Sequence, residues 1–146
     1  TDKRYYLLAH GEILQGAQVM QLKYPLHKYL LANGERRVRV DPEGLPSHTA
    51  LRVSKTMRRD DAAITLAEAQ LKTGRTHQIR VHLSSRGHAL VGDLLYGGRP
   101  ALGMIRQALH ATELAFEHPD DGRMMVFNVA LPSDLAAAWR EVIPDR

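Results

Sequence analysis

Residues 71–83 read LKTGRTHQIRVHL, a stretch in which a strand ends, the chain turns and a helix begins. A Thr-Gly pair breaks the strand, and Thr76 has the kind of side chain that commonly caps a helix N-terminus. We therefore expect a helix over residues 77–86. Gly87 should end it in the left-handed conformation that glycine adopts without steric cost.

Arg80 stands at the edge of the apolar face of this expected helix. At about 100° per residue, Ile79 and Leu83 point toward the core and Arg80 lies beside them. A guanidinium cannot shed its charge by deprotonation, so a place at the border of the core requires an anionic or hydrogen-bonding partner. The other interpretation is a stem packed along the core edge with its charged head in water. Spacing alone leaves both interpretations open.

Segments on either side of the helix alternate in a way that is typical of strands. Residues 15–28, interrupted by Pro25, are expected to form a loop with little regular structure, and a second helix is expected over residues 134–143, capped by Ser133. Because most links between strands are short, we predict an α+β domain with flanking helices and a mixed, mainly antiparallel sheet. The expected strands are residues 3–9, 36–40, 48–55, 64–72, 109–117 and 124–131.

Composition narrows the classes of protein that the chain can represent. Its 146 residues suit one domain, and no apolar run approaches the roughly 18 residues that a membrane span needs. The absence of cysteine excludes disulfides and Cys-ligated metals. Twenty Lys and Arg residues against 16 Asp and Glu residues give a net charge of +4, and the bases are clustered. Clustered bases favour a nucleic-acid partner.

Other catalytic motifs find little support. The eight histidines are scattered and form no His-Glu-x-x-His pair, so no zinc site is expected. Neither a phosphate-binding Gly-x-x-x-x-Gly-Lys loop nor a Gly-x-Ser-x-Gly nucleophile elbow is present.

The order of several motifs resembles the RluA family of RNA pseudouridine synthases. Residues 71–83 are followed by GHALVGDLLYGG at 87–98, LHA at 109–111 and HP at 118–119. The stretch NGERRVRV at 33–40, with EGLPS at 43–47, is similar to the branch that modifies large-subunit ribosomal RNA, the synthase C type. The resemblance runs from residue 3 to about residue 132 and so covers nearly the whole chain.

The resemblance implies an activity and two catalytic residues. Members of this family cleave the N-glycosidic bond of uridine, turn the uracil and rejoin it through C5, without a metal or cofactor. Their Lys/Arg-x-Tyr strand, six residues before a Gly, falls on Tyr5 and Gly11. Tyr5 would stack on the flipped uracil and is a candidate for handling the C5 proton. Arg80 would pair with the catalytic carboxylate.

Residues expected to contact RNA follow from the motif and from charge position. The expected partner is large-subunit ribosomal RNA, bound by a monomer in the cytoplasm with no membrane involved. The expected contacts are Arg75, His77, Gln78, Arg58, Arg59 and Arg99.

One part of the family pattern is missing. The catalytic Asp of these enzymes lies in a His-Arg-Leu-Asp-x-x-Thr-Ser-Gly segment, which this sequence lacks, and Asp93 belongs to the Gly-Asp-x-x-Tyr-Gly block and matches nothing catalytic. We therefore expect residues 1–146 to be the C-terminal part of a single catalytic domain, inactive alone. The alternatives are a non-catalytic RNA-binding module and a structural domain with a basic surface.

Overall fold

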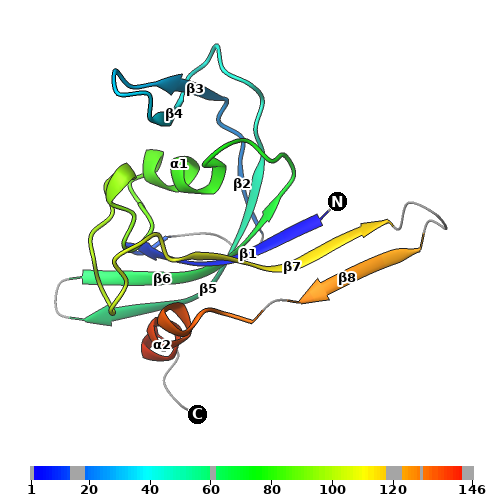
Figure 1. Cartoon of the computed structure of the whole chain (residues 1–146). Coiled ribbons are helices and arrows are strands. Elements are labelled where there is room, and N and C mark those ends of the chain that lie inside the picture. The colour runs from blue at the N-terminus through cyan, green and yellow to red at the C-terminus, as the bar shows by residue number, and fades with distance from the viewer. Residues whose placement is uncertain (1, 14–18, 60–61, 118–122, 129, 143–146) are drawn as a thin grey trace.

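The computed structural model describes residues 2–13, 19–59, 62–117, 123–128 and 130–142 (Figure 1). Its main feature is a six-stranded sheet in the order β2-β5-β6-β1-β7-β8, in which every neighbouring pair is antiparallel. The strands are β1 (Asp2–His10), β2 (Met20–Leu22), β5 (Thr49–Arg59), β6 (Ala62–Leu71), β7 (Leu109–Glu117) and β8 (Met124–Asn128). With two helices added, this confirms the predicted α+β class and the mainly antiparallel sheet.

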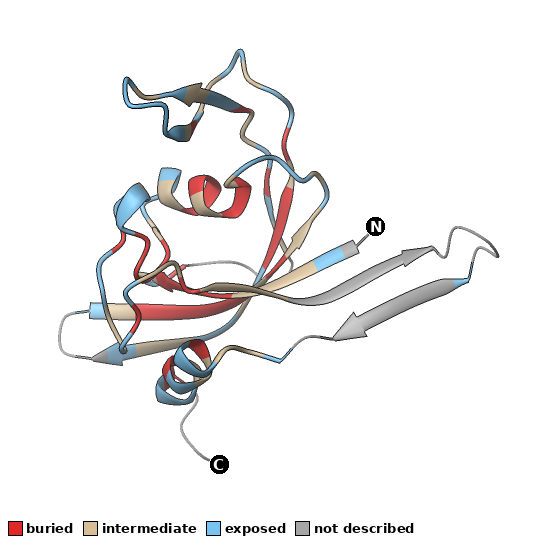
Figure 2. Ribbon diagram, viewed as in Figure 1, coloured by how far each residue is buried: buried red, intermediate tan, exposed pale blue. Residues whose placement is uncertain are grey.

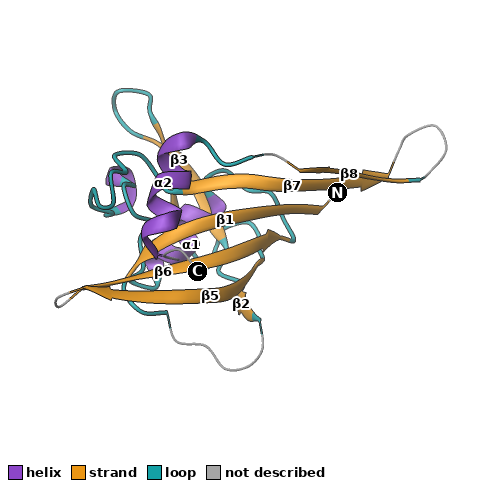
Figure 3. Ribbon diagram, turned by 90° about the horizontal axis from the view of Figure 1, so that it is seen from below, coloured by secondary structure: helices purple, strands orange, loops and turns teal. Residues whose placement is uncertain are grey.

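The two helices lie on opposite faces of the sheet. Helix α1 (Gln78–Ser85) lies on one face, under a separate hairpin of β3 (Leu26–Leu30) and β4 (Arg36–Val40), and α2 (Ser133–Val142) lies on the other (Figure 1). A short 3-10 turn, η1 (Leu94–Tyr96), follows α1. Figure 3 shows the twisted central strands side by side from below.

Strand β1 supplies the core on both faces. Successive side chains of a strand point to opposite sides, so Leu7 joins the cluster beneath α1 while Leu8 joins the cluster beneath α2. Both leucines are fully buried, as the red central strands in Figure 2 indicate. Ile79 and Leu83 of α1 pack on the Leu7 side, which confirms the apolar face predicted from the sequence.

A register shift marks the middle of β1. Arg4 is opposite Glu113 of β7, whereas the next residue, Tyr5, is opposite Ala111, so β7 holds one extra residue at this point. Such bulges bend a strand and re-aim the side chains beside them. Tyr5 therefore lies at a distortion of the sheet.

The structure corrects several sequence-based boundaries. Helix α1 begins at Gln78, and its N-cap is His77, at φ 52°, with no side-chain cap, so the prediction that Thr76 caps the helix is wrong. The predicted loop over residues 15–28 holds β2 and the start of β3, on either side of Pro25. The prediction for Gly87 is confirmed, because its φ is 82°.

The strands of the β5–β6 hairpin are longer than predicted, and α2 begins at Ser133 itself. Residues 118–122, which link the expected strands 109–117 and 124–131, lie outside the described residues. Neither helix in the described part of the chain has the length and apolar character that crossing a bilayer requires.

Candidate active site

A hollow of about 230 Å³ opens where β1, β6 and β7 meet the start of α1. It brings together Tyr5 and Arg80, the two residues predicted to be catalytic, with Arg75, His77 and Gln78, three of those predicted to contact RNA. The remaining lining residues are Leu71, Ile79, Gln107 and Leu109.

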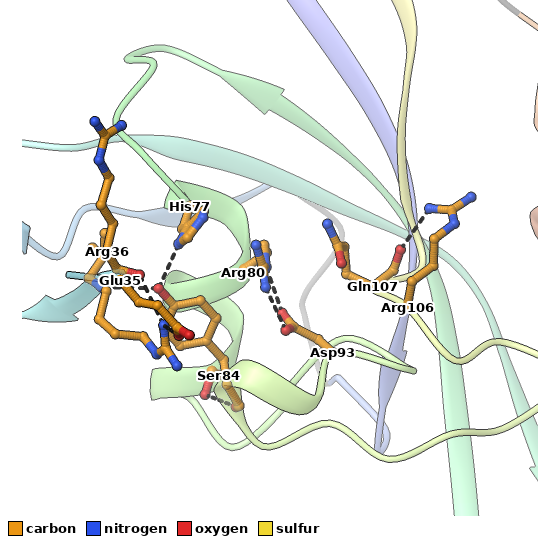
Figure 4. Close-up of polar contacts among 11 residues, drawn as sticks. Glu35, Arg36, His77, Arg80, Ser84, Asp93, Arg106 and Gln107 are labelled. Carbon is orange, nitrogen blue, oxygen red and sulfur yellow. Dashed lines mark hydrogen bonds and ion pairs between the residues drawn. The ribbon is translucent and has the colours of Figure 1, made fainter. Parts of the chain in front are cut away.

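Arg80 is held by a buried carboxylate within the same chain. Its Nε and Nη2 donate to the two oxygens of Asp93, each over 2.9 Å (Figure 4). The side chain of Asp93 is 1% exposed and that of Arg80 13% exposed. A two-point guanidinium–carboxylate contact fixes orientation as well as distance. The predicted need of Arg80 for a partner is therefore met, by a residue that the sequence did not identify as that partner.

Gly92 allows the tight turn that brings Asp93 to Arg80 of α1. Gly92 has φ 78°, and a Cβ at this position would lie 2.1 Å from the carbonyl oxygen of Arg106. No other residue allows this close approach together with a left-handed backbone. The glycine in the Gly-Asp pair is thus the sequence signal that, with hindsight, points to a carboxylate held by a tight turn.

Tyr96 joins Arg80 to His77 and to the β3–β4 hairpin. The Arg80 guanidinium lies 5.0 Å from the centre of the Tyr96 ring, and the Tyr96 hydroxyl accepts a hydrogen bond from the backbone N–H of Val38. The same hydroxyl lies 2.7 Å from Nδ1 of His77. Burial raises the pKa of Tyr96, so the hydroxyl keeps its proton at neutral pH.

His77 is held in its neutral form. Burial lowers the pKa of His77, and the positive charge of Arg80 lowers it further. Nδ1 of His77 is engaged by the Tyr96 hydroxyl, so a ligand in the hollow would meet Nε2. His77 can therefore offer one hydrogen bond to a ligand without adding a charge to the hollow.

Gln78 holds the turn that precedes α1. Its side-chain oxygen accepts from Thr73 Oγ1 and from the backbone N–H of Arg75, and its nitrogen donates to the His48 carbonyl and to Thr49 Oγ1. The amide is buried, and these four bonds satisfy it. The expectation that Gln78 contacts RNA stays a prediction, and the observed bonds support a role in shaping the loop.

Tyr5 and Gln107 complete the wall opposite α1. Tyr5 is half-buried, and burial raises the pKa of its hydroxyl, so the phenol is protonated at neutral pH. Sequence reasoning did not single out Gln107. It lines the same hollow as Arg80.

The other predicted RNA contacts lie elsewhere. Arg58 forms an ion pair with Glu12, and the backbone N–H of Arg99 donates to Nε2 of His10 over 2.9 Å. His10 is at the far end of β1, about 17 Å from Tyr5 at 3.3–3.4 Å per residue. Neither arginine lines the hollow. The side chain of Arg59 lies outside the described residues.

The hollow combines an aromatic ring, a fixed guanidinium and a neutral imidazole, and none of the described residues that line it is acidic. An aromatic face suits stacking with a base, and the cation suits an anionic group. Asp93 does not line the hollow, and both of its oxygens are bonded to Arg80. It is therefore poorly placed to attack a ligand.

Comparisons with known proteins agree with this arrangement. A family model described as RNA pseudouridylate synthase matches residues 1–85. Ribosomal large subunit pseudouridine synthase D of Yersinia pestis is 38% identical over 91% of this chain and 42% of its own length. Ribosomal large subunit pseudouridine synthase C of Haemophilus influenzae is 38% identical over 97% of this chain and 44% of its own length.

A solved structure is also similar. Human RNA Pseudouridylate Synthase Domain Containing 1 has a TM-score of 0.70 and 28% identity, over 93% of this chain and 58% of that one. The chain thus spans less than half the length of the two bacterial relatives.

Proposed function

The chain belongs to the RNA pseudouridylate synthase family, and we propose that it forms the Tyr5 and Arg80 side of a site that isomerises uridines of large-subunit ribosomal RNA to pseudouridine. The observation that carries this proposal is the placement of Tyr5 and Arg80 in one hollow, with Arg80 fixed by Asp93. The names of the bacterial relatives support ribosomal RNA as the substrate.

The proposed reaction conserves the atoms of the nucleoside. The bond between N1 and C1′ breaks, the uracil turns, and a bond forms between C5 and C1′. The proton leaves C5, and N1 carries a proton at the end. Flipping the base out of its stack costs a few kcal/mol, and stacking on Tyr5 would offset part of this, since one base–aromatic contact contributes about 1–3 kcal/mol.

In this proposal, the catalytic carboxylate comes from outside residues 1–146. The hollow has no acidic lining residue in the described part of the chain, and Asp93 is buried and engaged. The greater length of the relatives supports a chain that is one part of a longer protein. In this proposal it is the C-terminal part of a single catalytic domain. Arg80 would hold the incoming carboxylate ionised and correctly aimed. The 146-residue chain alone would then be inactive.

Release of tritium from RNA labelled at uracil C5 tests the proposal. The complete polypeptide should release tritium from large-subunit ribosomal RNA, whereas a non-catalytic RNA-binding module would bind the RNA and release none. Failure to release tritium from any such RNA contradicts the proposed function.

Tyr5→Phe separates stacking from proton handling. The ring remains, so RNA affinity should stay within about twofold, while loss of the hydroxyl should slow turnover about 100-fold if it transfers a proton. Tyr29→Phe is the matched control, because Tyr29 lies on β3 with its ring against Arg39 and outside the hollow. An unchanged rate in Tyr5→Phe would reduce Tyr5 to a stacking surface.

A further inference from the structure

A second hollow, of about 250 Å³, lies between the β3–β4 hairpin and the turn that enters α1. The exposed Leu45 and the buried Leu26 and Val38 form its apolar wall, and Lys28 and Arg75 give it two positive charges. None of the described residues that line it is acidic. An apolar surface beside cations fits a ligand that joins a flat ring to an anion, and a nucleotide is such a ligand.

Arg75 connects the second hollow to the candidate active site. It is the residue that lines both, and its Nε donates to the carbonyl of Pro46 over 3.1 Å. The Arg75 backbone N–H is held in turn by the buried amide of Gln78. Arg75 is therefore held in place by hydrogen bonds at both its backbone and its side chain.

The hairpin is fixed in place over α1. Leu26 and Val38 pack with Val81 of α1 in a small core of their own, and the backbone N–H of Val38 is bonded to Tyr96. The apolar wall of the second hollow is thus tied to the helix that carries Arg80. The two hollows share Arg75 as a lining residue, so they are neighbours on this face of the molecule.

We propose that the second hollow binds the nucleotide next to the target uridine, with its base against the apolar wall and its phosphate at Lys28 and Arg75. This inference rests on the proposed function, because it takes RNA as the substrate. In this assignment, the β3–β4 hairpin recognises the nucleotide next to the target uridine, whereas β1 and α1 hold the reacting uridine itself.

Filling the hollow tests the proposal. A Cβ added at Gly74 meets nothing within 4 Å, and the φ of Gly74 lies outside the left-handed region, so Gly74→Leu adds bulk without strain. The complete polypeptide is mixed with RNA oligonucleotides that carry the target uridine and either a normal or an abasic neighbour on its 5′ or 3′ side. Filter binding then gives the dissociation constant of each pair. Ala130→Leu adds bulk at an exposed position outside the hollow and is the control.

In the wild type, removing one of the two neighbouring bases should weaken binding at least about fivefold. Gly74→Leu should weaken binding of the intact RNA by a similar factor. In this variant, removing the same base should weaken binding no further, because both changes remove the same contact and their effects are not additive. The same abasic loss in Gly74→Leu as in the wild type would overturn the proposal. So would a wild type that is indifferent to both abasic positions.

Lys28→Ala provides a second variant should Gly74→Leu fail to fold. It should reduce the salt dependence of RNA binding, whereas Lys23→Ala, an exposed lysine outside the hollow, should not. Equal slopes for the two variants would contradict a phosphate contact at Lys28. Binding is measured without turnover, so this test can fail while tritium release from the intact RNA succeeds.

Discussion

Arg80 uses only part of its guanidinium to hold Asp93. Nε and Nη2 are engaged, and Nη1 donates to none of the residues that the structure describes. A planar group with donors on several edges can hold a buried carboxylate on one side and a second carboxylate on another. A lysine, with its single ammonium, would not keep both in a fixed plane.

Asp93 should therefore stabilise the fold as well as position Arg80. Asp93→Ala leaves the largely buried Arg80 without its counter-ion, and breaking such a pair costs about 3–5 kcal/mol. Urea unfolding of the complete polypeptide measures this loss. Glu35→Ala removes the exposed partner of Arg37 and should change the free energy of unfolding by less than about 1 kcal/mol. Similar losses in both variants would show that the Asp93 pair has no special role.

Helix α1 rests on a chain of buried hydrogen bonds. The Gln78 amide donates to Thr49 Oγ1, the Thr49 hydroxyl lies 2.9 Å from Nδ1 of His82, and the other ring nitrogen of His82 lies 2.9 Å from the Tyr24 carbonyl. The carbonyl can only accept, so Nε2 carries the proton and Nδ1 accepts from Thr49. Every donor and acceptor in this series of hydrogen bonds has a partner when His82 is neutral.

Protonation of His82 should destabilise the helix. Burial lowers the pKa of His82, so the unfolded chain takes up a proton near the ordinary value of about 6.5 while the folded chain does not. Between the two pKa values the unfolded state binds more protons, and the free energy of unfolding falls as the pH falls. Urea unfolding from pH 7.5 to pH 5 should show this decline.

His82→Gln keeps a donor and an acceptor but cannot be protonated, and it should flatten the pH dependence. His27→Gln, at an exposed position on β3, is the control. A decline that is as steep in His82→Gln as in the wild type would assign the pH effect to other groups.

Sequence patterns over a few residues predicted the helices and strands whose main contacts are with nearby parts of the chain. The apolar face of α1 is visible in the sequence because its members are three or four positions apart. The β5–β6 hairpin is visible because its two strands follow one another directly in the chain. Strand β2 was missed because its three residues pair with residues 49–51 of β5, which lie far along the chain. The Thr76 cap was wrong because His77 adopts a left-handed backbone and Gln78 provides the bonds that hold the turn.

The candidate site was predicted in part, for a similar reason. The helical position of Arg80 predicts that it needs a partner, but its partner follows a turn shaped by Gly92, which has no periodic pattern. The placement of Tyr5 came from the family resemblance, and the bulge beside it is a property of pairing with β7. Gln107 lies two residues before the start of β7 and had no motif to mark it.

At the scale of the whole molecule, the hollows lie on the α1 side of the sheet, and α2 closes the other side. Both hollows have positively charged side chains and no described acidic lining residue. The two bacterial relatives have more than twice the length that matches here. In our account, a segment outside residues 1–146 brings the missing carboxylate to the Nη1 side of Arg80.

Tritium release by Arg80→Lys in the complete polypeptide tests this account most directly. Lysine keeps a positive charge for Asp93, so the variant should fold and should lose less free energy of unfolding than Asp93→Ala. The loss of the fixed guanidinium should slow release at least about 100-fold, as removal of a preorganised catalytic donor does. Arg140→Lys, at an exposed position on α2 and outside both hollows, should release tritium at the wild-type rate. A folded Arg80→Lys protein that releases tritium as fast as the wild type would contradict the account.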